Sequence, residues 1–139
     1  MELKVDSRKC GEKRFLTDQE SLRVLLVDFV RAMGFHAFGA PYIRDCAFPS
    51  PVGGALSAVV FLGESSITVH TYPEHDAVFI DVFHCKEFDV SKAFCWLVSG
   101  FAMDVEQTTT LLLDRGISEA GIPLVTRVNP WFASYPVGV

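Results

Sequence analysis

Hydrophobic and polar residues alternate along this chain with two different periods, which predict helices at two places and strands between them. The first helix is expected after Thr17-Asp18-Gln19-Glu20, which has the form of a capping box, and before Gly34, a typical helix C-cap. A second helix is expected over residues 90–103, with Asp89 as its N-cap. The apolar stripe of the first helix consists of Leu22, Leu25, Leu26, Phe29, Val30 and Met33.

Between the two helices the apolar period changes to two, the spacing of half-buried strands. Strands are predicted over residues 55–62, 66–71 and 77–83, and the short segment Gly63-Glu64 separates the first two. Helices segregated from a meandering sheet predict an α+β fold, organised as a two-layer sandwich.

The flanks of this region are less regular. Residues 35–54 are expected to contain a strand followed by a long loop, because they are rich in proline, glycine and aromatic residues. A further strand is predicted over residues 108–113 and is expected to end at Asp114-Arg115-Gly116. The C-terminal segment, from about residue 120, contains three prolines and is expected to be extended.

Length and composition fit a single domain spanning residues 1–139. Half of the residues are hydrophobic and twelve are phenylalanine, which argues against a disordered chain. The net charge of −5 and the lack of a basic stripe argue against a nucleic-acid partner. No apolar stretch reaches the ~20 residues of a membrane span, so no membrane association is expected.

The four cysteines, Cys10, Cys46, Cys85 and Cys95, are irregularly spaced. This spacing argues against a disulfide framework and against a metal site, and it favours a reducing, cytoplasmic location. Cys46 and Cys95 are expected to be small buried core residues.

The candidate chemistry is concentrated in residues 63–85. Glu64 directly precedes Ser65, His70 follows five residues later and Cys85 twenty residues later. A serine hydroxyl can attack the preceding carbonyl where the peptide bond lies in a strained or tight turn, which Gly63-Glu64 between two strands favours. Taken singly, each of these residues is more often structural: a Glu-Ser dipeptide is usually an ordinary turn, and a lone strand histidine usually has a structural hydrogen bond.

In combination, the spacing resembles that of the prokaryotic S-adenosylmethionine decarboxylase proenzymes, most strongly over residues 50–90. The resemblance implies an antiparallel sheet with helices on one face. It also implies self-cleavage between Glu64 and Ser65, giving a β chain of residues 1–64 and an α chain of residues 65–139. The processed protomers are expected to form a homodimer with residues of both copies in each active site.

The resemblance also implies a role for each matching residue. Ser65 is the precursor of a covalent pyruvoyl group, whose carbonyl forms a Schiff base with the amine of a small-molecule substrate. His70 assists the elimination that releases Glu64, and Ser57 assists the same processing reaction. Cys85 is the proton donor in decarboxylation.

Substrate binding is expected to involve Tyr72 and Glu74, with Glu74 holding the ribose hydroxyls of a nucleoside. Two positions depart from the family pattern: Ser66 stands where the family usually has histidine, and Tyr72 where it usually has tryptophan. Tyrosine keeps an aromatic face for an adenine or sulfonium group but offers less of it. Ser66 is also a possible competitor of Ser65 as nucleophile, although the family register favours Ser65.

Three functions are therefore compatible with the sequence. The resemblance favours decarboxylation of S-adenosylmethionine for polyamine (spermidine) synthesis. The departures leave open the decarboxylation of a plain amino acid, L-arginine or L-ornithine, on the same scaffold. The third is an unprocessed, catalytically silent binding homologue, and the retention of Ser65, His70 and Cys85 together argues against it.

Overall fold

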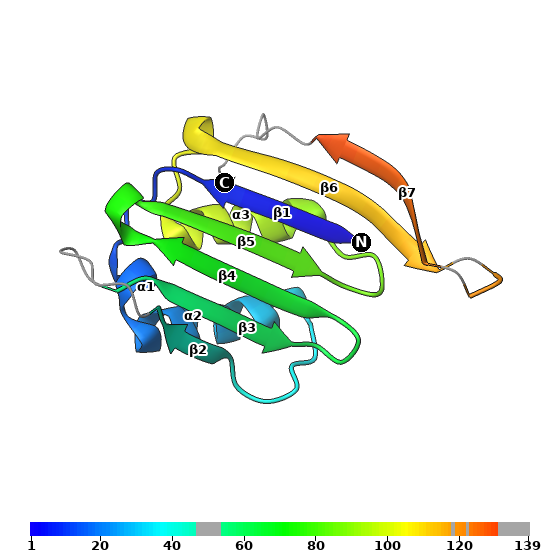
Figure 1. The fold of residues 1–139 in the computed structure, drawn as a ribbon, viewed down its shortest axis with the longest axis horizontal. Helices are drawn as coiled ribbons and strands as arrows, with labels where there is room; N and C mark the ends of the chain where they lie inside the picture. Colours follow the sequence, from blue (N-terminus) through cyan, green and yellow to red (C-terminus); the bar gives the residue numbers. More distant parts are fainter. Residues whose placement is uncertain (47–53, 118, 122, 131–139) are drawn as a thin grey trace.

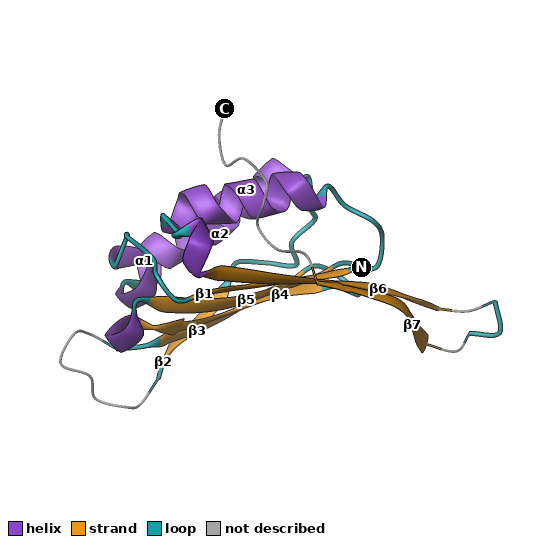
Figure 2. Ribbon diagram, turned by 90° about the horizontal axis from the view of Figure 1, so that it is seen from above, coloured by secondary structure: helices purple, strands orange, loops and turns teal. Residues whose placement is uncertain are grey.

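The computed structural model describes residues 1–46, 54–117, 119–121 and 123–130. These residues form two layers: a seven-stranded antiparallel sheet, and helices that pack on one of its faces (Figure 1, Figure 2). The predicted α+β two-layer sandwich with an antiparallel sheet is confirmed.

The strand order in the sheet is β2-β3-β4-β5-β1-β6-β7 (Figure 1). The three strands predicted between the helices are confirmed as β3, β4 and β5, and a short 3-10 helix, η1 (Pro73–His75), connects β4 to β5. The strands are β1 (Glu2–Ser7), β2 (Tyr42–Asp45), β3 (Leu56–Phe61), β4 (Ser66–Tyr72), β5 (Ala77–Phe83), β6 (Thr108–Ile117) and β7 (Pro123–Pro130). The long loop expected after β2 falls partly on residues 47–53, outside the described residues.

β1 lies between β5 and β6 in the sheet and was not predicted from the sequence. Leu3 and Val5 are fully buried under the helices, and charged residues occupy the alternate positions of the strand. Charged residues are depleted in strands, so this short segment becomes a strand through its pairing on both sides rather than through its own propensity.

β6 is longer than predicted. The expected end of the strand at Asp114-Arg115-Gly116 is wrong, because these residues pair with β7 and the register shifts between Asp114 and Arg115. A β-bulge of this kind absorbs an extra residue without ending the ladder. The expected extended C-terminal segment is confirmed for β7, while residues 131–139 lie outside the described part of the chain.

The sheet is covered by α1 (Arg14–Thr17), α2 (Gln19–Met33) and α3 (Val90–Phe101), and a second 3-10 helix, η2 (Val105–Gln107), follows α3. Asp18, not Thr17, is the N-cap of α2, and its carboxylate accepts a hydrogen bond from the Ser21 N–H at 2.9 Å. Gly34 adopts φ 70° as the C-cap, as predicted, and Asp89 caps α3. Within the described residues, no helix is long and apolar enough to span a bilayer.

A buried threonine connects the helical layer to the sheet through hydrogen bonds. Thr71 in β4 is 2% exposed, and its hydroxyl donates to the Leu16 carbonyl of α1 at 2.7 Å. The same oxygen accepts from the Leu56 N–H of β3, also at 2.7 Å. Both bonds satisfy backbone groups that would otherwise be buried without a partner, which is costly.

The opposite face of the sheet carries no helix among the described residues (Figure 2). We call this surface the open face. It exposes four large aromatic side chains, Tyr42, Phe61, Tyr72 and Phe79, each more than two-fifths exposed. Apolar surface gathered on one face is typical of an interaction surface.

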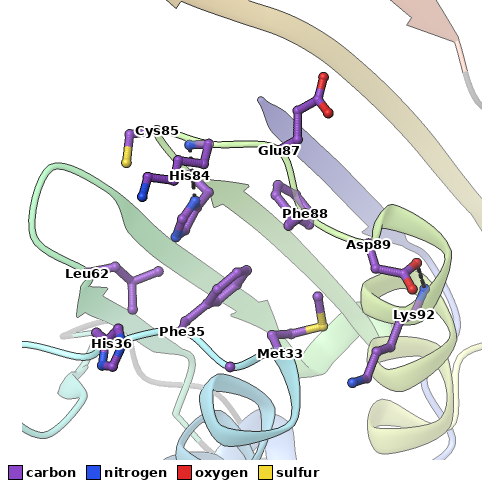
Figure 3. A pocket seen from close by; sticks show the side chains of 12 residues that line it. Met33, Phe35, His36, Leu62, His84, Cys85, Glu87, Phe88, Asp89 and Lys92 are labelled. Carbon is purple, nitrogen blue, oxygen red and sulfur yellow. Dashed lines mark hydrogen bonds between the residues drawn. The ribbon is translucent and has the colours of Figure 1, made fainter.

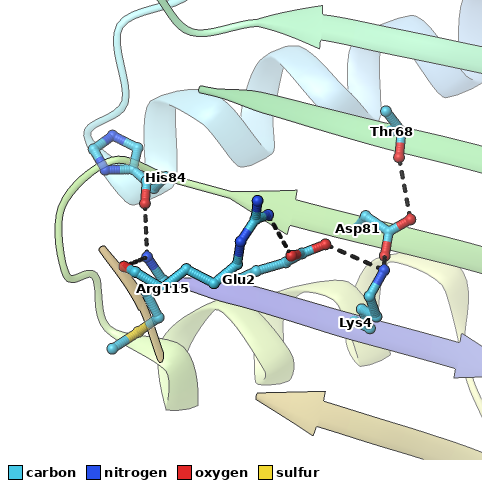
Figure 4. Close-up of polar contacts among 7 residues, drawn as sticks. Glu2, Lys4, Thr68, Asp81, His84 and Arg115 are labelled. Carbon is cyan, nitrogen blue, oxygen red and sulfur yellow. Dashed lines mark hydrogen bonds and ion pairs between the residues drawn. The ribbon is translucent and has the colours of Figure 1, made fainter. Parts of the chain in front are cut away.

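The open face also carries a network of charged side chains (Figure 4). Lys4 Nζ lies 2.7 Å from Asp81 and 3.1 Å from Glu2, and Glu2 in turn pairs with Arg115 at 2.7 Å. Asp6 is on the same face, and its partial burial together with the negative charge of Asp81 raises the pKa of its carboxyl above the ordinary value.

Candidate active site

The peptide bond between Glu64 and Ser65 lies in the hairpin turn that connects β3 to β4. The Leu62 N–H donates to the Ser65 carbonyl at 2.9 Å and closes the turn. Gly63 has φ 72°, a positive value that two-residue hairpin turns need at their first central position and that glycine adopts without strain. The tight turn predicted from Gly63-Glu64 is therefore confirmed.

The two adjacent serines have different surroundings. Ser65 is 5% exposed, and its hydroxyl oxygen accepts a hydrogen bond from the backbone N–H of Cys85 at 2.8 Å. Ser66 is the first residue of β4, half-buried, and lies opposite Phe61 and Phe83 in the neighbouring strands. The hydroxyl that is held beside Cys85 thus belongs to Ser65, and Cys85 itself is exposed.

A cavity of about 500 Å³ lies beside Cys85 and the turn (Figure 3). Its walls come from the end of α2 and the residues that follow it, from Leu62, from the segment between β5 and α3, and from Lys92 of α3. On one wall the rings of Phe35 and His84 stack with centroids 4.6 Å apart, and Phe88 meets Phe35 edge-on. This aromatic wall was not predicted from the sequence, because it joins segments far apart in the chain.

The remaining candidate residues gather at the other end of β4 (Figure 1). Ser57 of β3 and His70 of β4 lie opposite each other in the sheet, and the Ser57 hydroxyl is 2.9 Å from His70 Nδ1. The ring of Tyr72, two residues further along, lies 5.0 Å from that of Phe79. Glu74 is exposed in η1.

Within one chain, the structure therefore separates the candidate residues into two groups. Glu64, Ser65 and Cys85 form the first group, and Ser57 and His70, with the nearby Tyr72 and Glu74, form the second. Five residues of extended chain separate Ser65 from His70, which is about 16 Å at ~3.3 Å per residue. A histidine side chain does not span this distance.

The structure adds one residue to the second group. Cys46, which follows β2, is half-buried, and its Sγ lies 3.5 Å from Ser57 Oγ. The prediction that Cys46 is a core residue is wrong, whereas Cys95 does pack, partly buried, against the core. The pairing of β2 with β3 brings Cys46 to Ser57, and local patterning carries no signature of that register.

Comparison with known proteins identifies the family of this chain and agrees with its fold. A sequence model of the family described as S-adenosylmethionine decarboxylase matches residues 1–116. The S-adenosylmethionine decarboxylase proenzyme of Anoxybacillus flavithermus is 30% identical over 102 residues, which cover 73% of this chain and 76% of that protein. The corresponding proenzyme of Fervidobacterium nodosum is 31% identical over 104 residues, covering 70% and 75%.

Among solved structures, the adenosylmethionine decarboxylase of Aquifex aeolicus VF5 shares the fold. The TM-score is 0.68 at 22% sequence identity, over 85% of this chain and 91% of that chain. The matches in sequence define an enzyme of the pyruvoyl-dependent carboxy-lyase class. The chain belongs to the S-adenosylmethionine decarboxylase family, as its sequence predicted.

Proposed function

We propose that this protein is a self-processing proenzyme that decarboxylates S-adenosylmethionine, with Ser65 as the source of its pyruvoyl group. One observation carries the proposal: the Glu64–Ser65 bond lies in a tight hairpin turn, and the Cys85 N–H holds the Ser65 hydroxyl at 2.8 Å. Decarboxylated S-adenosylmethionine is a donor of aminopropyl groups, so the product would serve spermidine synthesis.

Processing needs only groups of the chain itself and water. Ser65 Oγ attacks the Glu64 carbonyl carbon, and the amide becomes an ester as the C–N bond breaks. A base removes the Ser65 α-proton, and cleavage of the Cβ–Oγ bond releases Glu64 as a new carboxylate terminus. The dehydroalanine left at position 65 tautomerises, takes up water and loses ammonia, which leaves the pyruvoyl group. The Cys85 N–H restricts the hydroxyl to one position in the turn, which favours the first step.

The surroundings of Ser65 fit a pyruvoyl group. The position is nearly inaccessible to solvent, which limits competing reactions of a ketone carbonyl with water. When formed, the group supplies a carbonyl that withdraws electrons from the substrate as carbon dioxide leaves. The Cys85 thiol is exposed beside the adjoining cavity, where it can deliver a proton to the substrate's α-carbon.

We infer that Ser57 and His70 act on the Ser65 of a second copy of the chain. The base that removes the Ser65 α-proton must reach it, and His70 of the same chain lies about 16 Å away along β4. In a two-fold dimer, each copy can contribute Ser65 and Cys85 to one site and Ser57 and His70 to the other. The exposed aromatic residues of the open face, where His70 also lies, support this face as the contact.

The second group of residues favours a nucleoside substrate over a plain amino acid. Tyr72 exposes 42% of its surface beside the Phe79 ring, and Glu74 follows two residues later. An aromatic face suits an adenine or a sulfonium cation, and a carboxylate suits ribose hydroxyls. Arginine and ornithine have no ribose for Glu74 to hold, so decarboxylation of these amino acids is the second candidate.

The mass of the denatured protein tests the processing. We expect two chains, residues 1–64 and 65–139, with the second lighter by one ammonia than its serine-started form. Ser65→Ala is expected to give one uncut chain without activity, whereas the matched control Ser66→Ala is expected to be cut. An uncut parent protein, or an active Ser65→Ala variant, would contradict the proposal.

Substrate choice needs a separate assay on the processed protein. Release of carbon dioxide from S-adenosylmethionine, L-arginine and L-ornithine is measured side by side. We expect turnover of S-adenosylmethionine alone. Turnover of arginine without turnover of S-adenosylmethionine would reassign the substrate but leave the processing reaction standing.

A further inference from the structure

Three polar side chains lie in a row on the open face: Cys46 directly after β2, Ser57 in β3 and His70 in β4. Cys46 Sγ lies 3.5 Å from Ser57 Oγ, and Ser57 Oγ lies 2.9 Å from His70 Nδ1. The backbone fixes all three positions: the Cys46 N–H donates to the Ala55 carbonyl at 2.8 Å, and Ser57 lies opposite His70 in the sheet.

We propose that Cys46 is a positioning residue that selects the tautomer of His70 through Ser57. The inference rests on the proposed role of His70 as the base in processing. Because Ser57 occupies Nδ1, the nitrogen left free to act on another copy is Nε2. A neutral histidine can accept a proton at Nε2 only when its own proton sits on Nδ1.

With the proton on Nδ1 of His70, the hydroxyl of Ser57 needs a different hydrogen-bond acceptor. If Nδ1 carries the proton, Nδ1–H donates to Ser57 Oγ, and the single hydroxyl proton of Ser57 must go to a different acceptor. Cys46 Sγ, at 3.5 Å, is in position to accept it. If the acceptor is lost, the Ser57 hydroxyl turns to Nδ1, the histidine proton moves to Nε2, and the free nitrogen can no longer act as a base.

A neighbouring side chain does not compete for the Ser57 hydroxyl. Arg44 lies opposite Ser57 in β2, but its guanidinium group is hydrogen-bonded to the hydroxyl of Tyr42 and packs over that ring. Arginine is in any case a donor only, so it cannot replace the acceptor that the sulfur provides.

The tautomer is measured by two-bond ¹H–¹⁵N NMR of the histidine rings at about pH 8, where an ordinary imidazole is mostly neutral and an ordinary thiol keeps its proton in most molecules. The Ser65→Ala chain serves as the sample, because it stays intact whether or not the parent is processed. His84 provides an internal reference for the other tautomer, since its Nδ1 accepts from the Lys86 N–H. We expect the Nδ1–H form of His70 in the parent and in Cys46→Ser, and a shift toward the Nε2–H form in Cys46→Ala.

Processing of chains that keep Ser65 provides the functional readout. Cys46→Ala is expected to slow self-cleavage about tenfold, which is less than the full rate contribution of a general base. The self-cleavage rate of Cys46→Ser is expected to stay within about twofold of that of the parent. Cys95→Ala, at the other half-buried cysteine, is the matched control and is expected to change neither readout. An Nε2–H form of His70 in the parent, or a tautomer unchanged by Cys46→Ala, would overturn the inference. Because the NMR readout requires no cleavage, failure of the proposed processing would be seen separately.

Discussion

Two variants that are each expected to be inactive should restore one another when they are produced together. Ser65→Ala removes the precursor of the pyruvoyl group, and His70→Ala removes the proposed base. If both residues of one site came from the same chain, no mixture of the two variants would contain an intact site. If they come from different copies, a mixed dimer has one site in which both residues are native and one in which both are replaced.

The expected yield follows from the geometry and from random pairing. Ser65 and His70 are about 16 Å apart along β4, so His70 of the same chain cannot rescue Ser65. With equal amounts of the two variants, about half of the His70→Ala chains would have a Ser65→Ala partner, and those chains would be cut. The Ser65→Ala chains would all remain intact.

Different affinity tags on the two variants allow mixed dimers to be isolated and their masses measured. The control replaces Ser65→Ala by the double variant Ser65→Ala/His70→Ala, whose dimers contain no native His70 and should give no cut chains. His70 is exposed on the open face, so its replacement should leave the fold intact. Uncut chains throughout the isolated mixed dimers, or efficient cleavage of His70→Ala alone, would refute the shared site.

Three further predictions concern stability and reactivity. Thr71→Val leaves two buried backbone groups without their partner and should lower the free energy of unfolding by about 2–4 kcal/mol in denaturant titrations. Thr109→Val, at an exposed position, should change it by less than about 0.5 kcal/mol. Equal effects of the two variants would contradict the role of Thr71. Burial raises the pKa of the Cys10 thiol to about 11, whereas Cys85 is exposed. A thiol reagent added to the native protein at about pH 8 should therefore modify Cys85 and leave Cys10 unmodified, as measured by peptide mapping. Equal labelling of the two cysteines would argue against the burial of Cys10. Because the pKa of Asp6 is raised in the folded protein, ionisation of its carboxyl lowers the free energy of unfolding as pH rises above the ordinary value of 3.8. Asp6→Asn should therefore raise the melting temperature near pH 7 but not near pH 3. A gain at both pH values would show another cause.

Much of the fold could be predicted because most elements carry their own signal. The stripe of α2, the cap at Asp89 and the alternating residues of β3, β4 and β5 are local patterns, and each gave an element at nearly the right place. β1 carries a weaker signal, since charged residues fill every second position, and its pairing with β5 and β6 makes it a strand. The bulge in β6 likewise depends on pairing with β7, which no local pattern contains.

In the site, too, some features have a local sequence signal and others depend on strand pairing. The Gly63-Glu64 turn carries a local signal, because an alternating segment lies on each side of it. Cys85 lies beside Ser65 through the pairing of β4 with β5, and the family resemblance, not a local pattern, linked these two residues. The position of Cys46 beside Ser57 depends on the register between β2 and β3, and a shift of one residue would have turned it away.

The polar network of the open face is compatible with covering that face by a second copy. Burying charges is costly unless they are already paired, and Lys4 is paired with Asp81 and Glu2 within one chain, as Glu2 is with Arg115. A second copy would therefore need to supply no counterion to these four side chains, and the exposed aromatic residues of the open face offer apolar contacts. If Ser65 must wait for His70 of that second copy, self-cleavage becomes dependent on assembly, so a chain would be cut only after its open face is covered.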